Sequence, residues 1–295
     1  MILNKQGQTE EEFLAVYNPD EFEKPSVSVD VLLFAIATIE NPDVRKLADK
    51  KLQVLLVQRD NHPYIGQWAI PGGFVGMNEN LNDAALRELR EETAVDNVYI
   101  EQLYTWGDLG RDPRTRVIST SYMALINKNS CRLQAGTDVV DARWFDVNIN
   151  IIEEDEKNEA DSTITQKVVE LVLKTQDITC KARIKETITI INRFTTSKLE
   201  IIEQDNISFD HAKIIYYGLM RMRNKIEYTD IAFSLLPNEF TLAELQLVYE
   251  IILGKTFTKP NFQRKIRNMV LETDKFEGGA HRPARLFRFN KDWGK

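Results

Sequence analysis

The chain has 295 residues, of which 43% are hydrophobic and 28% are charged. This length suits about two domains, and the composition is typical of a soluble globular protein and argues against global disorder or a membrane span. Two cysteines, Cys131 and Cys180, give neither a disulfide framework nor a Cys-x-x-Cys metal site. No signal peptide precedes the first apolar run, so a cytoplasmic protein is expected. The formal net charge of −7, taken over the whole chain, disfavours nucleic acid as a partner.

The first part of the chain alternates strand-like and helix-like patterns. Apolar and β-branched runs predict strands over residues 29–39 and 52–58. After a break at 71–73, apolar residues at helical spacing predict a helix over 81–93. Further strands are expected over residues 99–104, 117–126 and 139–145. This order of elements predicts a mixed α/β domain over residues 1–150.

The middle of the chain, residues 151–208, has a weaker pattern. Residues 151–162 are acidic and poor in apolar side chains, which predicts an exposed linker. The apolar residues of 168–173 suit either a helix or a strand, and residues 184–191 alternate weakly with threonine. We therefore expect an acidic linker followed by a small accessory segment.

The last part of the chain, residues 209–295, predicts three helices and a β-hairpin. Residues with capping preferences mark the starts of the helices: Asp210 for the first, Thr241 with Glu244 for the second, and Pro260 for the third. The hairpin is expected from the runs 270–273 and 285–289 on either side of a turn at 278–279.

The helix predicted over residues 81–93 places three carboxylates on one face. Glu88 lies one turn from Glu91 and Glu92, and Glu88 and Glu92 are only about 6 Å apart along the axis. Like charges this close resist joint ionisation and need a counter-charge, and hard oxygen ligands suit Mg²⁺ or Mn²⁺. Arg87 precedes Glu91 by four residues and can orient its carboxylate. The alternative, a solvated helix face, is disfavoured by the glycine and glutamate at fixed distances before the helix.

The run from Gly73 to Val95 resembles the Nudix box, Gly-x5-Glu-x7-Arg-Glu-(apolar)-x-Glu-Glu-x-Gly-(apolar), except at Ala94, where the family has glycine. The matching positions are Gly73, Glu79, Arg87, Glu88, Leu89, Glu91, Glu92 and Val95. The resemblance implies an α/β/α sandwich with a mixed sheet, and hydrolysis of nucleoside diphosphates linked to another group. It also implies that Arg87, Glu88, Glu91 and Glu92 are catalytic and that the three glutamates hold the divalent metal.

Two neighbouring segments extend this site. The run from Trp68 to Phe74 resembles the Nudix lead-in, and its Gly72 and Gly73 let the backbone approach a substrate. The turn at residues 110–116 holds three arginines, of which Arg111 and Arg114 are expected to bind the phosphates of an anionic substrate. A merely solvated turn is an equal alternative for these arginines.

The net charge of the chain hides a split. Residues 211–295 hold 15 lysines and arginines against 9 acidic residues, a net charge of +6. The other 210 residues hold 23 basic and 36 acidic residues, a net charge of −13. This asymmetry removes the objection to a nucleic-acid partner for the C-terminal part.

Three helices and a hairpin with a basic third helix resemble a winged helix-turn-helix, whose third helix enters the major groove of double-stranded DNA. On the assumption that Phe262 and Ile266 are buried, one set of residues would face DNA from this helix and the hairpin. The expected DNA-binding residues are Asn261, Arg264, Lys265, Asn268, Arg282 and Arg285. A basic protein-interaction or dimerisation module is the alternative.

The two halves together resemble the Nudix-related transcriptional regulators of NAD metabolism, over most of the chain. This resemblance implies a homodimeric DNA-binding regulator whose Nudix domain senses, and by its retained glutamates also hydrolyses, ADP-ribose or a related metabolite. Two alternatives remain open at this point: a Mg²⁺-dependent ADP-ribose pyrophosphatase whose winged helix is only structural, and a sugar-sensing regulator of the same architecture.

Overall fold

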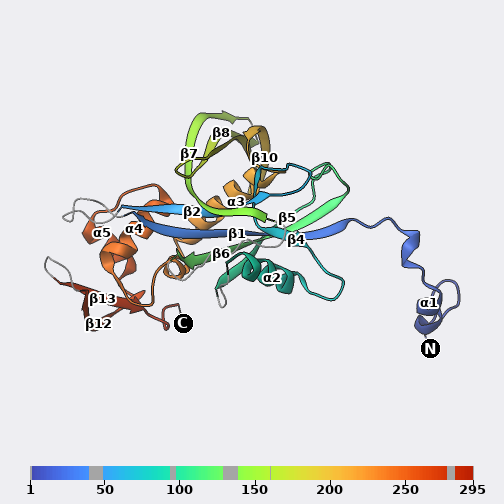
Figure 1. Cartoon of the computed structure of the whole chain (residues 1–295), viewed down its shortest axis with the longest axis horizontal. Helices are drawn as coiled ribbons and strands as arrows, with labels where there is room; N and C mark the ends of the chain where they lie inside the picture. Colours follow the sequence, from blue (N-terminus) through green and yellow to red (C-terminus); the bar gives the residue numbers. More distant parts are fainter. Residues whose placement is uncertain are drawn as a thin grey trace.

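A large mixed sheet forms the centre of the computed structural model (Figure 1). The structure describes residues 2–39, 49–93, 98–128, 139–159, 161–277 and 283–294. The strands of this sheet are β1 (Ser26–Ile39), β2 (Asp49–Arg59), β3 (Trp68–Ala69), β4 (Gly72–Phe74), β5 (Tyr99–Trp106), β6 (Val117–Asn127), β7 (Val139–Asn158), β8 (Ser162–Lys174), β9 (Thr179–Ile191) and β10 (Phe194–Asp205). Their order is β10-β9-β8-β7-β2-β1-β6-β5, with β3 on β2 and β4 on β1. Because β1 and β6 are parallel and the other pairs antiparallel, the sheet is mixed, as predicted.

Helices cover both faces of this sheet, because β1 buries alternate side chains on opposite faces. Val31 and Leu33 belong to the core under helix α2 (Leu81–Thr93), and Leu32 and Phe34 to the core under helix α3 (His211–Lys225). Helix α3 packs tightly, since a side chain at Gly218 would come within 2.1 Å of Leu32. The predicted α/β/α sandwich is confirmed.

The acidic segment of residues 151–162 is not a linker. Strand β7 runs through it to Asn158 with its side chains exposed, and β8 to β10 then continue the same sheet. Strands pair through their backbones, so acidic side chains on a solvated strand do not prevent pairing. The buried residues come instead from β8, in particular Val169, Leu171 and Leu173. The end of β7 and the strands β8, β9 and β10 therefore extend the central sheet.

The C-terminal part forms the expected helices and hairpin. After a short 3-10 helix, η3 (Ile231–Leu235), come β11 (Phe240–Thr241), α4 (Leu242–Leu253), α5 (Lys259–Ile266), β12 (Val270–Glu277) and β13 (Ala284–Phe289). The strands form a small sheet in the order β11-β13-β12. The capping box of Thr241 and Glu244 is present at the start of α4, and Phe262 and Ile266 are buried.

Helix α3 connects the two parts of the molecule. It packs on the large sheet, and near its C-terminal end Arg223 donates a hydrogen bond of 2.8 Å from Nε to the carbonyl of Ile252 on α4. One continuous apolar core includes residues of the large sheet, α3, α4 and α5. The C-terminal module is thus packed against the first domain rather than carried on a flexible linker.

The N-terminal residues contribute little to this core. Helix α1 (Glu10–Val16) and the 3-10 helix η1 (Pro19–Glu21) contain no buried residue, and α1 stands apart from the body in Figure 1. Among the described residues, no helix is both long and apolar enough to cross a membrane.

Candidate functional site

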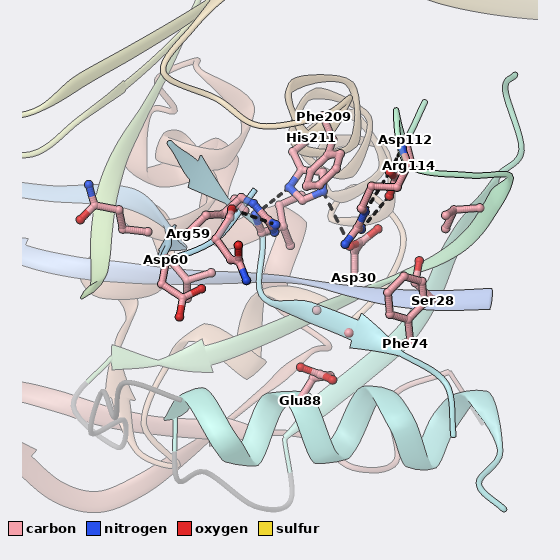
Figure 2. A pocket seen from close by; sticks show the side chains of 18 of the residues that line it. Ser28, Asp30, Arg59, Asp60, Phe74, Glu88, Asp112, Arg114, Phe209 and His211 are labelled. Carbon is pink, nitrogen blue, oxygen red and sulfur yellow. Dashed lines mark hydrogen bonds and ion pairs between the residues drawn. The ribbon is translucent and has the colours of Figure 1, made fainter. Parts of the chain in front are cut away.

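A cavity of about 650 Å³ lies between helix α2 and the loop that leads into α3. Figure 2 shows the Glu88 carboxylate on the α2 side, with Arg59, Arg114, Phe209 and His211 across the cavity from it. Its lining includes most of the residues expected to form the site, namely Gly72, Gly73, Arg87, Glu88, Glu91, Arg111 and Arg114. Segments far apart in the sequence therefore meet at one place.

Arg87 organises the carboxylates of the Nudix box. Its guanidinium donates to both carboxylate oxygens of Glu79, at 3.2 and 2.9 Å, and to Oε1 of Glu88 at 2.7 Å. The Glu91 carboxylate lies 3.7 Å from the same guanidinium. Arg87 accordingly lowers the pKa of Glu79, while burial raises the pKa of Glu88 against the opposing effect of Arg87. These contacts fix the positions of the carboxylates before any ligand binds.

The two glycines before the helix have separate steric reasons to be glycine. A Cβ on Gly73 would lie 2.1 Å from Oε1 of Glu88, and a Cβ on Gly72 would lie 2.3 Å from the carbonyl oxygen of Val29. Both distances are too short for any side chain. The backbone of β4 can therefore lie directly against the carboxylate only because these residues lack a Cβ.

The carboxylates in part fit a divalent metal ion. Glu88 is buried and shares the cavity with the exposed Glu91, and a cation would offset the cost of burying the Glu88 charge. The side chain of Glu92, the third expected ligand, lies outside the described residues, as does Ala94. Among the side chains that the structure describes, no group of three His, Cys, Asp or Glu residues is placed to hold a metal.

Arg111 is buried, whereas a phosphate-binding arginine was expected to be open to the ligand. Its guanidinium donates to both oxygens of Asp210, at 2.7 and 3.1 Å, and both side chains are buried. Asp210 occupies the N-cap position of α3 but makes no side-chain capping hydrogen bond, so the prediction that it caps the helix is wrong. Its carboxylate is taken by Arg111 instead. Arg111 thus joins the cavity wall to the start of α3.

His211 adds a second buried contact between α3 and the cavity wall. Its Nδ1 accepts a hydrogen bond of 2.9 Å from the backbone N–H of Ile70, and its Nε2 lies 3.7 Å from Oδ1 of Asp30. Burial lowers the pKa of His211, which favours the neutral ring. His211 therefore joins the start of α3 to the segment between β3 and β4.

Arg114 remains partly exposed beside two aromatic rings. Its guanidinium bonds both oxygens of Asp112, at 3.1 and 2.7 Å, and lies 5.4 Å from the ring centre of Phe74 and 5.8 Å from that of Phe209. Phe209 also lies 4.9 Å from the guanidinium carbon of Arg59.

Sequence reasoning did not select Arg59 or Phe209 as site residues. The only available signal was the charged pair Arg59-Asp60 that ends an apolar strand, and nothing in the sequence places Phe209 beside that strand.

The residues expected to contact DNA lie in different environments. Asn261 and Arg264 are exposed on α5, where Arg264 donates to Asn261 at 3.1 Å. Lys265 instead turns back to the Glu227 carboxylate at 2.6 Å. Asn268 is exposed but lies in the turn after α5, which ends at Ile266.

The two hairpin residues complete this set. Arg285 is exposed and paired with Glu272 across the hairpin, and Arg282 lies outside the described residues.

Comparison with known proteins agrees with this architecture. A NUDIX domain model matches residues 41–168, and a model of the NrtR DNA-binding winged helix domain matches residues 232–289. A protein of Acinetobacter baylyi named ADPR responsive transcriptional repressor NtrR is 31% identical over 293 residues, which cover 98% of this chain and 92% of that protein.

Two solved structures are similar over nearly the whole chain. A MutT/nudix family protein from Enterococcus faecalis is 28% identical with a TM-score of 0.64, covering 97% of this chain and 95% of that one. Shewanella oneidensis NrtR complexed with a 27mer DNA is 28% identical with a TM-score of 0.59, covering 90% of this chain and 93% of that one. The chain therefore belongs to the NrtR family, in which a Nudix domain is joined to a C-terminal winged helix domain.

Proposed function

We propose that the protein is a DNA-binding transcriptional regulator that responds to ADP-ribose or a related nucleoside diphosphate derivative. The carrying observation is the position of the cavity: its wall includes the residues that begin α3, and the other end of α3 contacts the winged helix. A ligand in the cavity can thus alter the placement of the DNA-binding module through one helix. The names of the Acinetobacter and Shewanella relatives support both a response to ADPR and binding to DNA.

The charges of the cavity suit a diphosphate bound together with a cation. Arg59 and Arg114 line one side together with Asp60 and Asp112, and the carboxylates of Glu88 and Glu91 lie on the α2 side with Arg87. We propose that Mg²⁺ or Mn²⁺ is held by these two glutamates together with Glu92. Bound there, the ion would shield the diphosphate charge and lower the pKa of an attacking water.

Hydrolysis is the second activity that the residues favour. Arg87 holds Glu79 and Glu88 in fixed positions, and Gly73 gives the backbone close access to Glu88. A protein that only bound its ligand would not need this arrangement. We propose that ADP-ribose is cleaved to AMP and ribose 5-phosphate, with Arg87 positioning the carboxylates and Glu88, Glu91 and Glu92 serving the metal and the water.

DNA binding is proposed for the exposed basic surface of the winged helix. Asn261 and Arg264 on α5 and Arg285 on β13 are exposed, whereas Lys265 is held by Glu227. We propose a homodimer that works in the cytoplasm, in which two winged helices contact half-sites about 34 Å apart or a multiple of that distance.

One experiment tests this proposal. The full chain is bound to DNA from its own upstream region with and without ADP-ribose and Mg²⁺, and AMP is measured in parallel. We expect ADP-ribose to change the DNA affinity, and Glu91→Gln or Glu92→Gln to abolish AMP release while DNA binding without ligand persists. A DNA affinity that saturating ADP-ribose leaves unchanged would contradict the regulator, and no AMP from the wild type would contradict the hydrolase.

A further inference from the structure

Arg59, the last residue of β2, lies in the cavity wall, and within the part of the chain that the structure describes no carboxylate is bonded to its guanidinium. Its guanidinium donates to the carbonyl of Pro63 at 2.7 Å and to that of Asn61 at 3.5 Å. No Asp or Glu oxygen within the described ranges of the chain lies within 4.0 Å of it, although its side chain is half-buried. A half-buried cation that contacts only carbonyls retains most of its capacity to bind an anion.

A second guanidinium lies on the same aromatic ring. Arg59 and Arg114 are 4.9 and 5.8 Å from the ring centre of Phe209, distances at which a cation is attracted to the ring. The ring therefore brings two like charges together on one side of the cavity. Figure 2 shows both arginines beside Phe209, across the cavity from Glu88.

Neither of the two neighbouring carboxylates, Asp112 and Asp60, forms an ion pair with Arg59. Asp112 is fully engaged by Arg114, which contacts both of its oxygens and donates its backbone N–H to it. Asp60 lines the cavity but is exposed and makes no ion pair with Arg59. Burial, the largest cause, and the nearby Arg114 lower the pKa of Arg59 against the opposing effect of Asp112 and Asp60. Within the described residues Arg59 is thus hydrogen-bonded to carbonyls and to no carboxylate, so an anion bound to its guanidinium would stabilise its charge.

Phe209 is held in place by the loop around it. It has a φ of 51°, uncommon for a residue with a side chain, and its carbonyl accepts a 2.7 Å hydrogen bond from Nε2 of Gln204. The next residue toward the N-terminus, Ser208, donates its backbone N–H to the carbonyl of Trp68 at 2.8 Å. The edge of the Tyr64 ring packs on Phe209 with the ring centres 4.8 Å apart. The ring is therefore a fixed support for the two guanidinium groups.

We propose that Arg59 and Arg114, supported by the ring of Phe209, form a phosphate-binding site that faces the carboxylates of α2. This site binds one phosphate group of a diphosphate. The metal ion proposed at Glu88 and Glu91, on the opposite side of the cavity, binds the other. This inference rests on the proposed function and adds Arg59 and Phe209 to the residues that bind the ligand. Phe209 precedes Asp210, the N-cap residue of α3. Binding of a phosphate at this site therefore acts directly on the position of the N-terminal end of α3.

Calorimetry with the full chain tests this site, with inorganic pyrophosphate as a probe in the presence of Mg²⁺ and ADP-ribose as a probe without added metal, so that ADP-ribose is not cleaved during the measurement. Arg59→Gln should weaken binding of both probes roughly 10- to 100-fold, the effect of losing charged hydrogen bonds. Phe209→Leu keeps the bulk but removes the ring, and should weaken binding roughly three- to tenfold. Arg143→Gln is the matched control, because Arg143 also lies over an aromatic ring, that of Trp68, but is paired with Asp141 and Asp177.

The outcomes separate this site from the proposed function. If the wild type binds both probes and Arg59→Gln binds them as tightly as Arg143→Gln does, the phosphate site is wrong and the proposed function stands. If the wild type binds neither probe, the proposed function itself is wrong. Arg59→Lys, which keeps the charge but not the planar donors, should bind with intermediate affinity, and it replaces the glutamine variant if that variant fails to fold.

Discussion

Arg111 and Asp210, 99 residues apart in the sequence, form a buried two-point ion pair between the ligand cavity and the first turn of α3. Nη2 of Arg111 lies 2.7 Å from Oδ1 and Nε lies 3.1 Å from Oδ2 of Asp210, and the side chains are only 6% and 9% exposed. Asp30, at 3.9 Å from Arg111, is the next nearest carboxylate. This pair fixes the N-terminal end of α3, and the winged helix packs against the same helix near its C-terminal end.

Removing one member of this pair should cost much more stability than removing a surface pair. Arg111→Met leaves Asp210 buried with only Lys213 near it, at 3.9 Å, so we expect a loss of about 3–5 kcal/mol in the free energy of unfolding. Arg143→Met breaks the solvent-exposed pairs with Asp141 and Asp177 and should cost far less stability. Urea denaturation of both variants measures the difference, and equal losses would show that the buried pair is not stabilising.

The close approach of Gly73 to Glu88 predicts a strong effect of a single methyl group. Gly73→Ala puts a Cβ 2.1 Å from the carboxylate, which must move by about 1 Å, and misplacement of this size costs about 100-fold in rate. AMP release from ADP-ribose and Mn²⁺ affinity should both fall. Gly107→Ala is the control, since its Cβ meets nothing nearer than Nη2 of Arg116 at 3.8 Å. Equal activity of the two variants would exclude the expected crowding of Glu88.

The buried His211 predicts a pH dependence of stability. Burial, the largest cause, lowers the pKa of His211 in the folded protein, whereas the unfolded chain takes up the proton near pH 6.5. Protons therefore favour the unfolded state, so the contribution of His211 to stability is complete above pH 6.5 and is lost as the pH falls below it. The charged groups that influence this proton are Asp30 and Asp210, which oppose the shift, and Arg111 and Arg59, which add to it.

His211→Asn tests this dependence while keeping an acceptor near Nδ1 for the N–H of Ile70. Between pH 7.5 and 5.5 the free energy of unfolding of the wild type should fall more steeply than that of the variant, by up to about 1.4 kcal/mol per pH unit. Denaturant titrations at several pH values give the two slopes. Parallel slopes would mean that the folded protein protonates His211 as readily as the unfolded chain does.

Local patterns predicted the parts of the structure that depend on neighbouring residues. The helix over 81–93 and the capping box at Thr241 are present because amphipathic spacing and caps act within one or two turns. The acidic half of β7 was predicted to be a linker because its side chains are exposed, whereas it is held in the sheet by backbone pairing with β8. No local signal shows that a strand with exposed side chains is completed by its partners.

The cavity shows that local sequence patterns also fail to predict single contacts between distant segments. The carboxylates of α2 could be predicted because their spacing lies within one helix. The partner of Arg111 could not, because Asp210 reaches it only when α3 docks on the sheet. Arg59 and Phe209 meet for the same reason, from strand β2 and the loop after β10.

Two adjacent basic residues of α5 should affect DNA binding differently. Among the described residues, Arg264 is exposed and hydrogen-bonded to Asn261 within α5, whereas Nζ of Lys265 is 2.6 Å from Glu227 and lies over the ring of Tyr249. If α5 enters the major groove, Arg264→Gln removes one contact to a phosphate or a base, and the affinity for DNA falls. Loss of a phosphate contact also reduces the magnitude of the slope of log K against log salt by about 1. Lys265→Gln removes the same formal charge, but the Lys265 ammonium group is already paired with the Glu227 carboxylate. It should leave the slope unchanged and lower stability by about 1 kcal/mol or less.

Titration of the upstream DNA fragment at several salt concentrations, with thermal unfolding in parallel, distinguishes the two variants. Lys181→Gln on β9, far from the winged helix in the sheet order, is the control for loss of a positive charge in general. If Lys265→Gln reduced the salt slope as much as Arg264→Gln, the pair with Glu227 would have to open on DNA. If all three variants weakened binding equally, long-range charge would dominate over the placement of α5, because general attraction depends on net charge and not on which side chain carries it.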